Sequence, residues 1–209
     1  MFDIGTPVGL QDKCIFDVIY YFGRRAKEGL RAMGANFFDF QFDANGIEYC
    51  IPRANELDKN HQQAELQNKI MYSQPGNPAC PVLSLHKYID VLNPNNPNLW
   101  QKPKHFGYGN GVWFTKQPVG EHTLGDKMST WSEQFGLSQR YTNHCIRATV
   151  INVLGEAGVQ DRYILTVTGQ KSEQTLKHYQ ARTSNKKTAT WQCLGRSSSC
   201  YCTGQFCVW

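Results

Sequence analysis

A β-hairpin signal between residues 37 and 51 is the sequence feature that most constrains the fold of this chain. Apolar and polar residues alternate through FFDFQFD, the turn ANG follows, and the alternation resumes in IEYCI. Successive side chains of a strand point to opposite faces, and both Asn45 and Gly46 tolerate the positive φ of a tight turn. The stretch therefore predicts an antiparallel hairpin. A third strand is expected through Glu56 and Leu57, with Lys59 at or just beyond its edge.

Apolar residues recur at helical spacing on both sides of this hairpin, which predicts amphipathic helices around a small sheet. Residues 1–12 lack periodicity and are expected to be an irregular lead-in, with the first helix beginning near Cys14. A helix over 82–92 would have Pro81 at its first position. The three clearest stripes are Ile15, Val18, Ile19 and Phe22; Val82, Leu85, Ile89 and Leu92; and Leu124, Met128, Trp131 and Phe135. The pattern predicts an α+β fold that is mainly helical, with a small antiparallel sheet.

Composition indicates one sizeable folded domain. The chain has 209 residues, 40% of them hydrophobic and 12% aromatic, which is enough for a substantial core. The net charge of +5 suits a polyanionic partner without requiring one. No cleavable apolar leader is visible, so the eight cysteines are expected to be reduced thiols in an intracellular protein. No stretch approaches the roughly 20 apolar residues that span a bilayer, so no membrane partner is expected.

The segment from Tyr141 to Tyr179 carries the chemistry that the sequence suggests. In a helix over 142–157, His144 and Arg147 lie about one turn apart on one face and can reach the same small anion. Arg offers a planar fork of donors to phosphate oxygens, and His can donate a hydrogen bond or exchange a proton. Cys145 lies between them, but with no evident base it is better explained as a small buried thiol.

The segment contains His-x-x-Arg, then a Gly-x-x-Ser turn at residues 169–172, and then Tyr179. This order of motifs resembles the catalytic half of the tyrosine recombinases, which are integrase-like DNA strand-transfer enzymes. The longer segments around these motifs, YTNHCIRAT and VTGQKSEQTLKHYQ, are similar to the Crypton-derived branch of that family, which is found in eukaryotic transposons and in domesticated host genes. The resemblance covers roughly residues 14–182. It makes residues 1–13 a lead-in and residues 183–209 a basic tail that contains cysteines.

The resemblance implies a role for each member of a catalytic set. Arg25, which precedes an x-x-Glu element as in the family, and Arg147 would hold the nonbridging oxygens of a DNA phosphate, with His144 as a donor or proton carrier. Tyr179 would attack phosphorus and form a 3′-phosphotyrosyl bond, while Lys59 would protonate the departing 5′ oxygen. Gln170 stands where the family usually has His or Trp. No metal or nucleotide cofactor is implied, and the partner would be double-stranded DNA, with a homotetramer on the DNA and nuclear localisation.

Arg25, Lys59 and Tyr179 also have ordinary structural explanations. An arginine at a helix end is usually a solvated surface residue, a lysine beside a small sheet is normally solvated, and a tyrosine near a helix end is by default half-buried packing. Two functions therefore stay open. In the first, the chain is a DNA strand transferase or the catalytic fragment of one. In the second, it is a domesticated DNA-binding or protein-interaction module that has kept the fold.

Two departures from the family bear on that choice. Gln170 keeps a hydrogen bond in principle but loses the proton-transfer capacity of His. Only some dozen residues precede the first expected catalytic helix, whereas recombinases usually carry a separate N-terminal domain that closes on DNA. The tail cysteines, Cys193, Cys200, Cys202 and Cys207, lack the paired C-x-x-C spacing of a zinc site.

Overall fold

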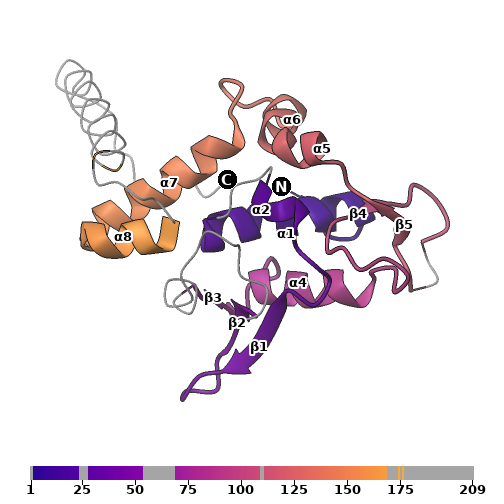
Figure 1. Ribbon diagram of the computed structural model, residues 1–209, viewed down its shortest axis with the longest axis horizontal. Coiled ribbons are helices and arrows are strands. Elements are labelled where there is room, and N and C mark those ends of the chain that lie inside the picture. Colours follow the sequence, from indigo (N-terminus) through magenta and orange to yellow (C-terminus); the bar gives the residue numbers. More distant parts are fainter. Residues whose placement is uncertain are drawn as a thin grey trace.

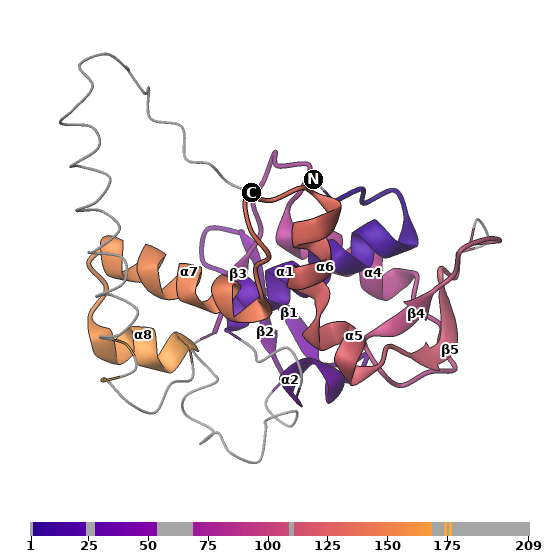
Figure 2. The same cartoon turned by 90° about the horizontal axis from the view of Figure 1, so that it is seen from above.

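A computed structural model shows a helical domain with two small antiparallel sheets (Figures 1 and 2). The structure describes residues 2–23, 28–53, 69–108 and 111–168, together with Gln174 and Leu176. The predicted fold class, a mainly helical α+β domain with a small antiparallel sheet, is confirmed at that level. Within the described ranges, no helix is long and apolar enough to cross a membrane.

Helix α1, Pro7–Phe22, runs through the middle of the domain between α4, Pro81–Asp90, and α7, Asn143–Glu156 (Figure 1). The Thr6 hydroxyl accepts a hydrogen bond from the Gly9 amide at 3.2 Å, and Pro7 occupies the start of the helix, where no amide hydrogen is needed. The expectation of an irregular lead-in to residue 12 and a helix from Cys14 is therefore wrong. The first turns of the helix were missed because their buried face carries polar residues, Gln11 and Asp12.

Buried ion pairs compensate the acidic residues of α1. Asp12 accepts a hydrogen bond from the Lys127 ammonium at 2.5 Å. The exposed fraction is 6% for the Asp12 side chain and 13% for the Lys127 side chain. Asp17 pairs with Lys13 one turn away on the same helix. Burial raises the pKa of Asp17 to about 6, although the Lys13 charge and hydrogen bond act in the opposite direction. The pair between Asp12 and Lys127 links α6, Lys127–Gln134, to α1.

The predicted hairpin is present as strands β1, Phe38–Phe42, and β2, Glu48–Pro52. Its turn is held by the Asp43 carboxylate, which accepts hydrogen bonds from the amides of Asn45 and Ile47, each at 2.9 Å. Gly46 has φ 75°, as the turn requires. The third strand of this sheet is β3, Met71–Tyr72, paired with β2. Glu56 and Leu57, where a third strand was expected, lie outside the described residues.

Helix α4, Pro81–Asp90, begins at the predicted proline and packs against α1. A short helix, α2, Glu28–Arg31, precedes the first sheet. The second sheet is a hairpin of β4, Gln101–Pro103, and β5, Phe114–Pro118, at one end of the domain (Figure 2). The expected apolar stripe over residues 124–135 is divided between α5, Glu121–Gly125, and α6, Lys127–Gln134.

Two apolar clusters hold the described elements together. The larger one surrounds α1, and its largest fully buried side chains include Phe22, Tyr88, Trp100 and Trp131. Leu124, Met128 and Trp131 of the predicted stripe are buried, whereas Phe135 is 38% exposed. The smaller cluster lies between α7, Asn143–Glu156, and α8, Asp161–Thr168. These two helices form the end of the domain opposite the β4–β5 hairpin (Figures 1 and 2).

Candidate functional site: the junction of α1, α7 and α8

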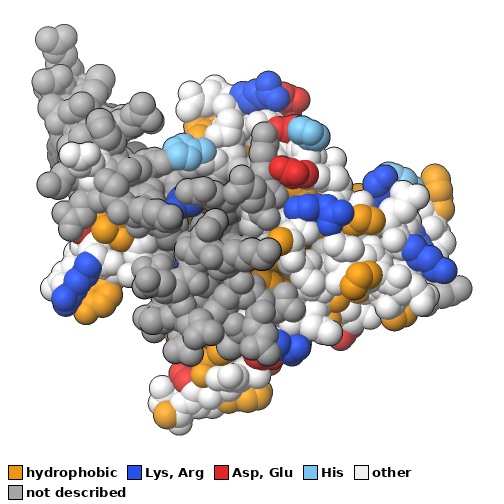
Figure 3. Space-filling view, viewed as in Figure 1, with side chains coloured by type: hydrophobic (Ala, Val, Ile, Leu, Met, Phe, Trp, Pro, Cys, Tyr) orange, Lys and Arg blue, Asp and Glu red, His pale blue; other side chains and the backbone are white. Residues whose placement is uncertain are grey.

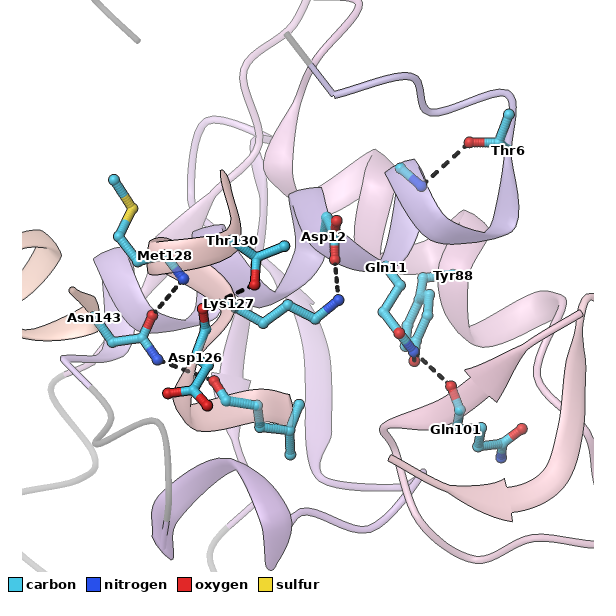
Figure 4. A network of polar contacts seen from close by, with 12 residues as sticks. Thr6, Gln11, Asp12, Tyr88, Gln101, Asp126, Lys127, Met128, Thr130 and Asn143 are labelled. Atoms are coloured by element: carbon cyan, nitrogen blue, oxygen red, sulfur yellow. Dashed lines mark hydrogen bonds and ion pairs between the residues drawn. The ribbon is translucent and has the colours of Figure 1, made fainter. Parts of the chain in front are cut away.

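Asn143 fixes the start of α7, the helix that carries His144 and Arg147 (Figure 4). Its side-chain oxygen accepts a hydrogen bond from the Met128 amide at 2.9 Å. Its side-chain nitrogen donates to the carbonyl oxygens of Leu124 at 2.9 Å and Gly125 at 2.8 Å. These bonds occupy the junction of α5 and α6, so the first turn of α7 has a defined position relative to the core.

The orientation of α7 follows from its buried residues, Ile146, Val150 and Ile151. His144 and Arg147, spaced i, i+3, lie one turn apart as predicted. The His144 side chain is exposed, whereas Arg147 is partly buried. The intervening Cys145 is partly exposed, with the Thr142 hydroxyl 3.8 Å from its sulfur, so the expectation that its thiol is buried is wrong.

Arg147 caps the C-terminal end of α8. Its Nη2 donates a hydrogen bond to the carbonyl oxygen of Thr168, the last residue of that helix. The last carbonyls of a helix have no partner within it and carry partial negative charge, so a guanidinium is a favourable cap. A guanidinium is a planar group with several N–H donors, and the bond to Thr168 helps to orient that plane.

The C-terminal end of α1 meets the same end of α8. Gly23 ends α1 in the left-handed conformation, with φ 58°. A Cβ atom at this position would lie 2.8 Å from the carbonyl oxygen of Val167 and 3.1 Å from Cα of Thr168. Glycine is therefore needed twice, for the backbone angle and for the close approach of α8. Gly23 comes two residues before Arg25, and Thr168 comes two residues before Gln170.

Lys69 is a component of this junction that the sequence did not single out. The residue is 6% exposed, and its ammonium donates a hydrogen bond to the carbonyl oxygen of Phe22, the last residue of α1, at 3.0 Å. It therefore stabilises the end of α1 as Arg147 stabilises the end of α8. Its only sequence signal is a lysine two residues before a short apolar strand, which does not distinguish it from a solvated residue.

Leu176 connects the junction to the segment that ends in Tyr179. Leu176 is fully buried, in the small cluster with Ile151 of α7 and Ile164 of α8. It precedes Tyr179 by three residues. The described part of this segment thus contacts the same helix pair that holds Arg147.

Of the six predicted site residues, the structure describes His144 and Arg147, both on α7. Arg25, Lys59, Gln170 and Tyr179 lie outside the described residues. The structure brings Arg147 into contact with Thr168, two residues before Gln170, and Thr168 lies against Gly23, two residues before Arg25. Figure 3 shows the face viewed in Figure 1, and much of its surface near α7 and α8 is grey, which marks residues that the structure does not describe.

Chemically, this junction presents a partly buried guanidinium, a buried ammonium and two helix C-terminal ends. In the ranges that the structure covers, no cluster of three or more His, Cys, Asp or Glu residues could hold a metal ion. No protein-family model matches the chain, and no curated protein shows significant similarity to it.

Proposed function

We propose that this chain is a DNA strand transferase of the tyrosine recombinase type, or the catalytic part of one. The observation that supports this most is the meeting of α1 and α8 beside Arg147. A reaction at a single phosphate needs its groups within a few ångströms of one another. Gly23 and Thr168 are each two residues from a member of the proposed set, and Arg147 bonds directly to Thr168.

In the proposed reaction, Arg25 and Arg147 hold the nonbridging oxygens of a DNA phosphate, which become more negative as the nucleophile adds. The Tyr179 oxygen attacks phosphorus and passes its proton to His144, and the bond from phosphorus to the 5′ oxygen breaks. Lys59 donates a proton to that oxygen, while Gln170 donates a hydrogen bond to the phosphate. The product is a 3′-phosphotyrosyl bond and a free 5′ hydroxyl. Attack by another 5′ hydroxyl reverses the step, so the bond energy is conserved.

The proposal extends to the partner and the place of action. Double-stranded DNA is the substrate, a homotetramer forms on it, and the protein acts in the nucleus. The net charge of +5 supports a polyanionic substrate.

A suicide duplex, nicked so that the cleaved strand is released, tests the proposal by trapping the covalent adduct. The chain should form an adduct that survives denaturation, and Tyr179→Phe should abolish it while leaving duplex affinity nearly unchanged. Tyr163→Phe is the matched control, because Tyr163 is 52% exposed on α8 and has no role in the reaction. Arg147→Ala should weaken both binding and cleavage, since it removes a phosphate contact as well as stabilisation of the transition state.

The same experiment separates the two functions that the sequence leaves open. Gln170→His, which introduces the residue usual in the family, should raise the rate of adduct formation. Binding to duplex DNA without any adduct, both for the unmodified chain and for Gln170→His, would refute the enzyme and leave the domesticated binding module.

A further inference from the structure

The β4–β5 hairpin carries a concentration of positive charge far from the candidate site. From residue 91 to residue 120 the sequence contains no acidic residue, and its cations are Lys102, Lys104 and Lys116, with His105 beside them. Lys and His side chains gather at this end of the face shown in Figure 3. We call the exposed part of the hairpin and its loop, within residues 102–108 and 111–117, the hairpin surface.

The lysines of the hairpin surface differ from those of the core in what they contact. Lys102 donates to the side-chain oxygen of Gln117 at 3.1 Å, and Lys104 donates to the carbonyl oxygen of Val112 at 2.8 Å. These acceptors are neutral. Among the ion pairs of the described residues, no carboxylate pairs with Lys102, Lys104 or Lys116, whereas Lys127 is paired with a buried aspartate. The positive charge of the hairpin surface is therefore not compensated locally.

An exposed aromatic residue lies among these cations. Phe106 is 90% exposed, the highest value among the large hydrophobic side chains that the structure describes as exposed. Next to it along the loop, Tyr108 packs edge-on against Trp113, with ring centroids 5.8 Å apart. Interleaved cations and exposed aromatic rings are typical of nucleic-acid surfaces, where lysines contact phosphates and apolar side chains contact bases in a groove.

The base of the hairpin is fixed to the core, so the hairpin surface has a defined position. Gln101, fully buried, donates from its side chain to the carbonyl oxygens of Asn96 at 3.1 Å and Asn98 at 3.0 Å. Its own carbonyl accepts a hydrogen bond from the Gln11 side chain of α1 at 2.7 Å (Figure 4). Phe114, also fully buried, packs edge-on against Tyr88 of α4 with ring centroids 5.0 Å apart.

Helix α1 sets the separation between the hairpin and the candidate site. Gln11 holds β4 near the start of α1, and Gly23 at its end contacts α8. Twelve helical residues span about 18 Å, and the strands extend further outward by about 3.3 Å per residue. The hairpin surface is thus roughly five to ten base pairs from the candidate site when measured along a duplex, at about 3.4 Å per base pair.

We infer that the hairpin surface is a second contact with duplex DNA, in which Lys102 and Lys116 bind backbone phosphates and Phe106 enters a groove. A two-stranded ribbon is narrow enough for the major groove. The choice of duplex DNA as the occupant rests on the proposed function, whereas the uncompensated charge and the exposed ring do not depend on it.

The test is the salt dependence of binding to a labelled duplex of about 30 base pairs, measured by fluorescence anisotropy with the full chain. Each phosphate contact contributes about 0.9 to the slope of log affinity against log salt. The variant Lys102→Ala with Lys116→Ala should therefore reduce the slope by about 2 and bind more weakly. Lys102→Arg with Lys116→Arg keeps both charges and should retain the slope. Phe106→Ala should weaken binding on the order of tenfold without changing the slope, because its contact is not ionic.

The outcomes separate this inference from the proposed function. An unchanged slope and affinity in the double alanine variant would overturn the inference, even if a covalent adduct forms. Tighter binding to single strands than to the duplex would overturn the assignment of the partner. A slope that depends on the two lysines would support the inference even if the chain never forms an adduct, in which case only the proposed function fails.

Discussion

Replacing Gly23 with alanine should separate the two helix ends that form the candidate site. The substitution has two costs that the structure defines. Residue 23 has φ 58°, and an L-residue in this conformation costs about 1 to 2 kcal/mol. The new methyl group would also lie 2.8 Å from the Val167 carbonyl oxygen, which belongs to the backbone and cannot rotate away. Overpacking of this kind costs about 1 to 3 kcal/mol. We therefore expect a total loss of about 2 to 5 kcal/mol in the free energy of unfolding.

Gly46→Ala is the matched control for this measurement. Gly46 has φ 75°, and a Cβ atom there would have nothing within 4 Å. The Gly46→Ala variant should therefore lose only the conformational part of the free energy of unfolding, about 1 to 2 kcal/mol. Urea denaturation of both variants gives the two free energies of unfolding. The excess loss at Gly23 measures the contact between α1 and α8.

Hydrogen exchange shows where the Gly23→Ala variant is weakened. If α8 moves away to accommodate the methyl group, its amides should exchange faster while those of β1 and β2 keep their protection. Equal losses of stability for Gly23→Ala and Gly46→Ala, with unchanged exchange in α8, would refute the argument that this glycine is required by the approach of α8.

Three further predictions concern the buried charges. The pKa of Asp17 is raised from 3.8 to about 6, so between these values the folded state holds a proton that the unfolded state has released. The free energy of unfolding should therefore fall by about 2 to 3 kcal/mol as pH rises from about 4 to about 6. Asp17→Asn should remove this pH dependence in urea denaturation. Lys127→Met leaves the Asp12 charge buried without its partner and should cost about 3 to 5 kcal/mol, with Asp12→Asn in the same chain restoring part of the loss. Lys69→Met removes the cap on the Phe22 carbonyl and should cost about 1 to 3 kcal/mol, measured in the same way.

Local signals account for the parts of the fold that the sequence predicted. The hairpin of β1 and β2 follows from alternation and from a turn whose glycine has positive φ, and both are properties of a dozen consecutive residues. The start of α4 at Pro81 and the end of α7 before Gly158 likewise depend on neighbours in sequence. Such features need no knowledge of the rest of the chain.

The parts that were missed depend on contacts between distant residues. The first turns of α1 look irregular because Gln11 and Asp12 are polar, and they are buried only because Gln101 and Lys127 satisfy them from elsewhere in the chain. Lys69 is a similar case, because its ammonium donates a hydrogen bond to the end of α1, 47 residues away in sequence. For the candidate site, spacing alone placed His144 and Arg147 on α7, whereas the meeting of α1 with α8 could not be read from any local pattern.

The electrostatics of the junction give the two proposed DNA surfaces different tasks. Arg147 and Lys69 each cap a helix C-terminus, and such an end carries about half a negative elementary charge, so a substantial part of each positive charge is offset close by. Lys102 and Lys104 donate to neutral oxygens, and the described carboxylates form no ion pair with the hairpin lysines, so their field extends further into solvent. Attraction of a distant duplex should therefore depend mainly on the hairpin, and orientation of one phosphate mainly on Arg147. It follows that removing Lys102 and Lys116 should slow association, and more so at low salt, while leaving the cleavage rate of bound suicide duplex unchanged. A slower cleavage step in that variant at saturating protein would show that the two tasks are not separate.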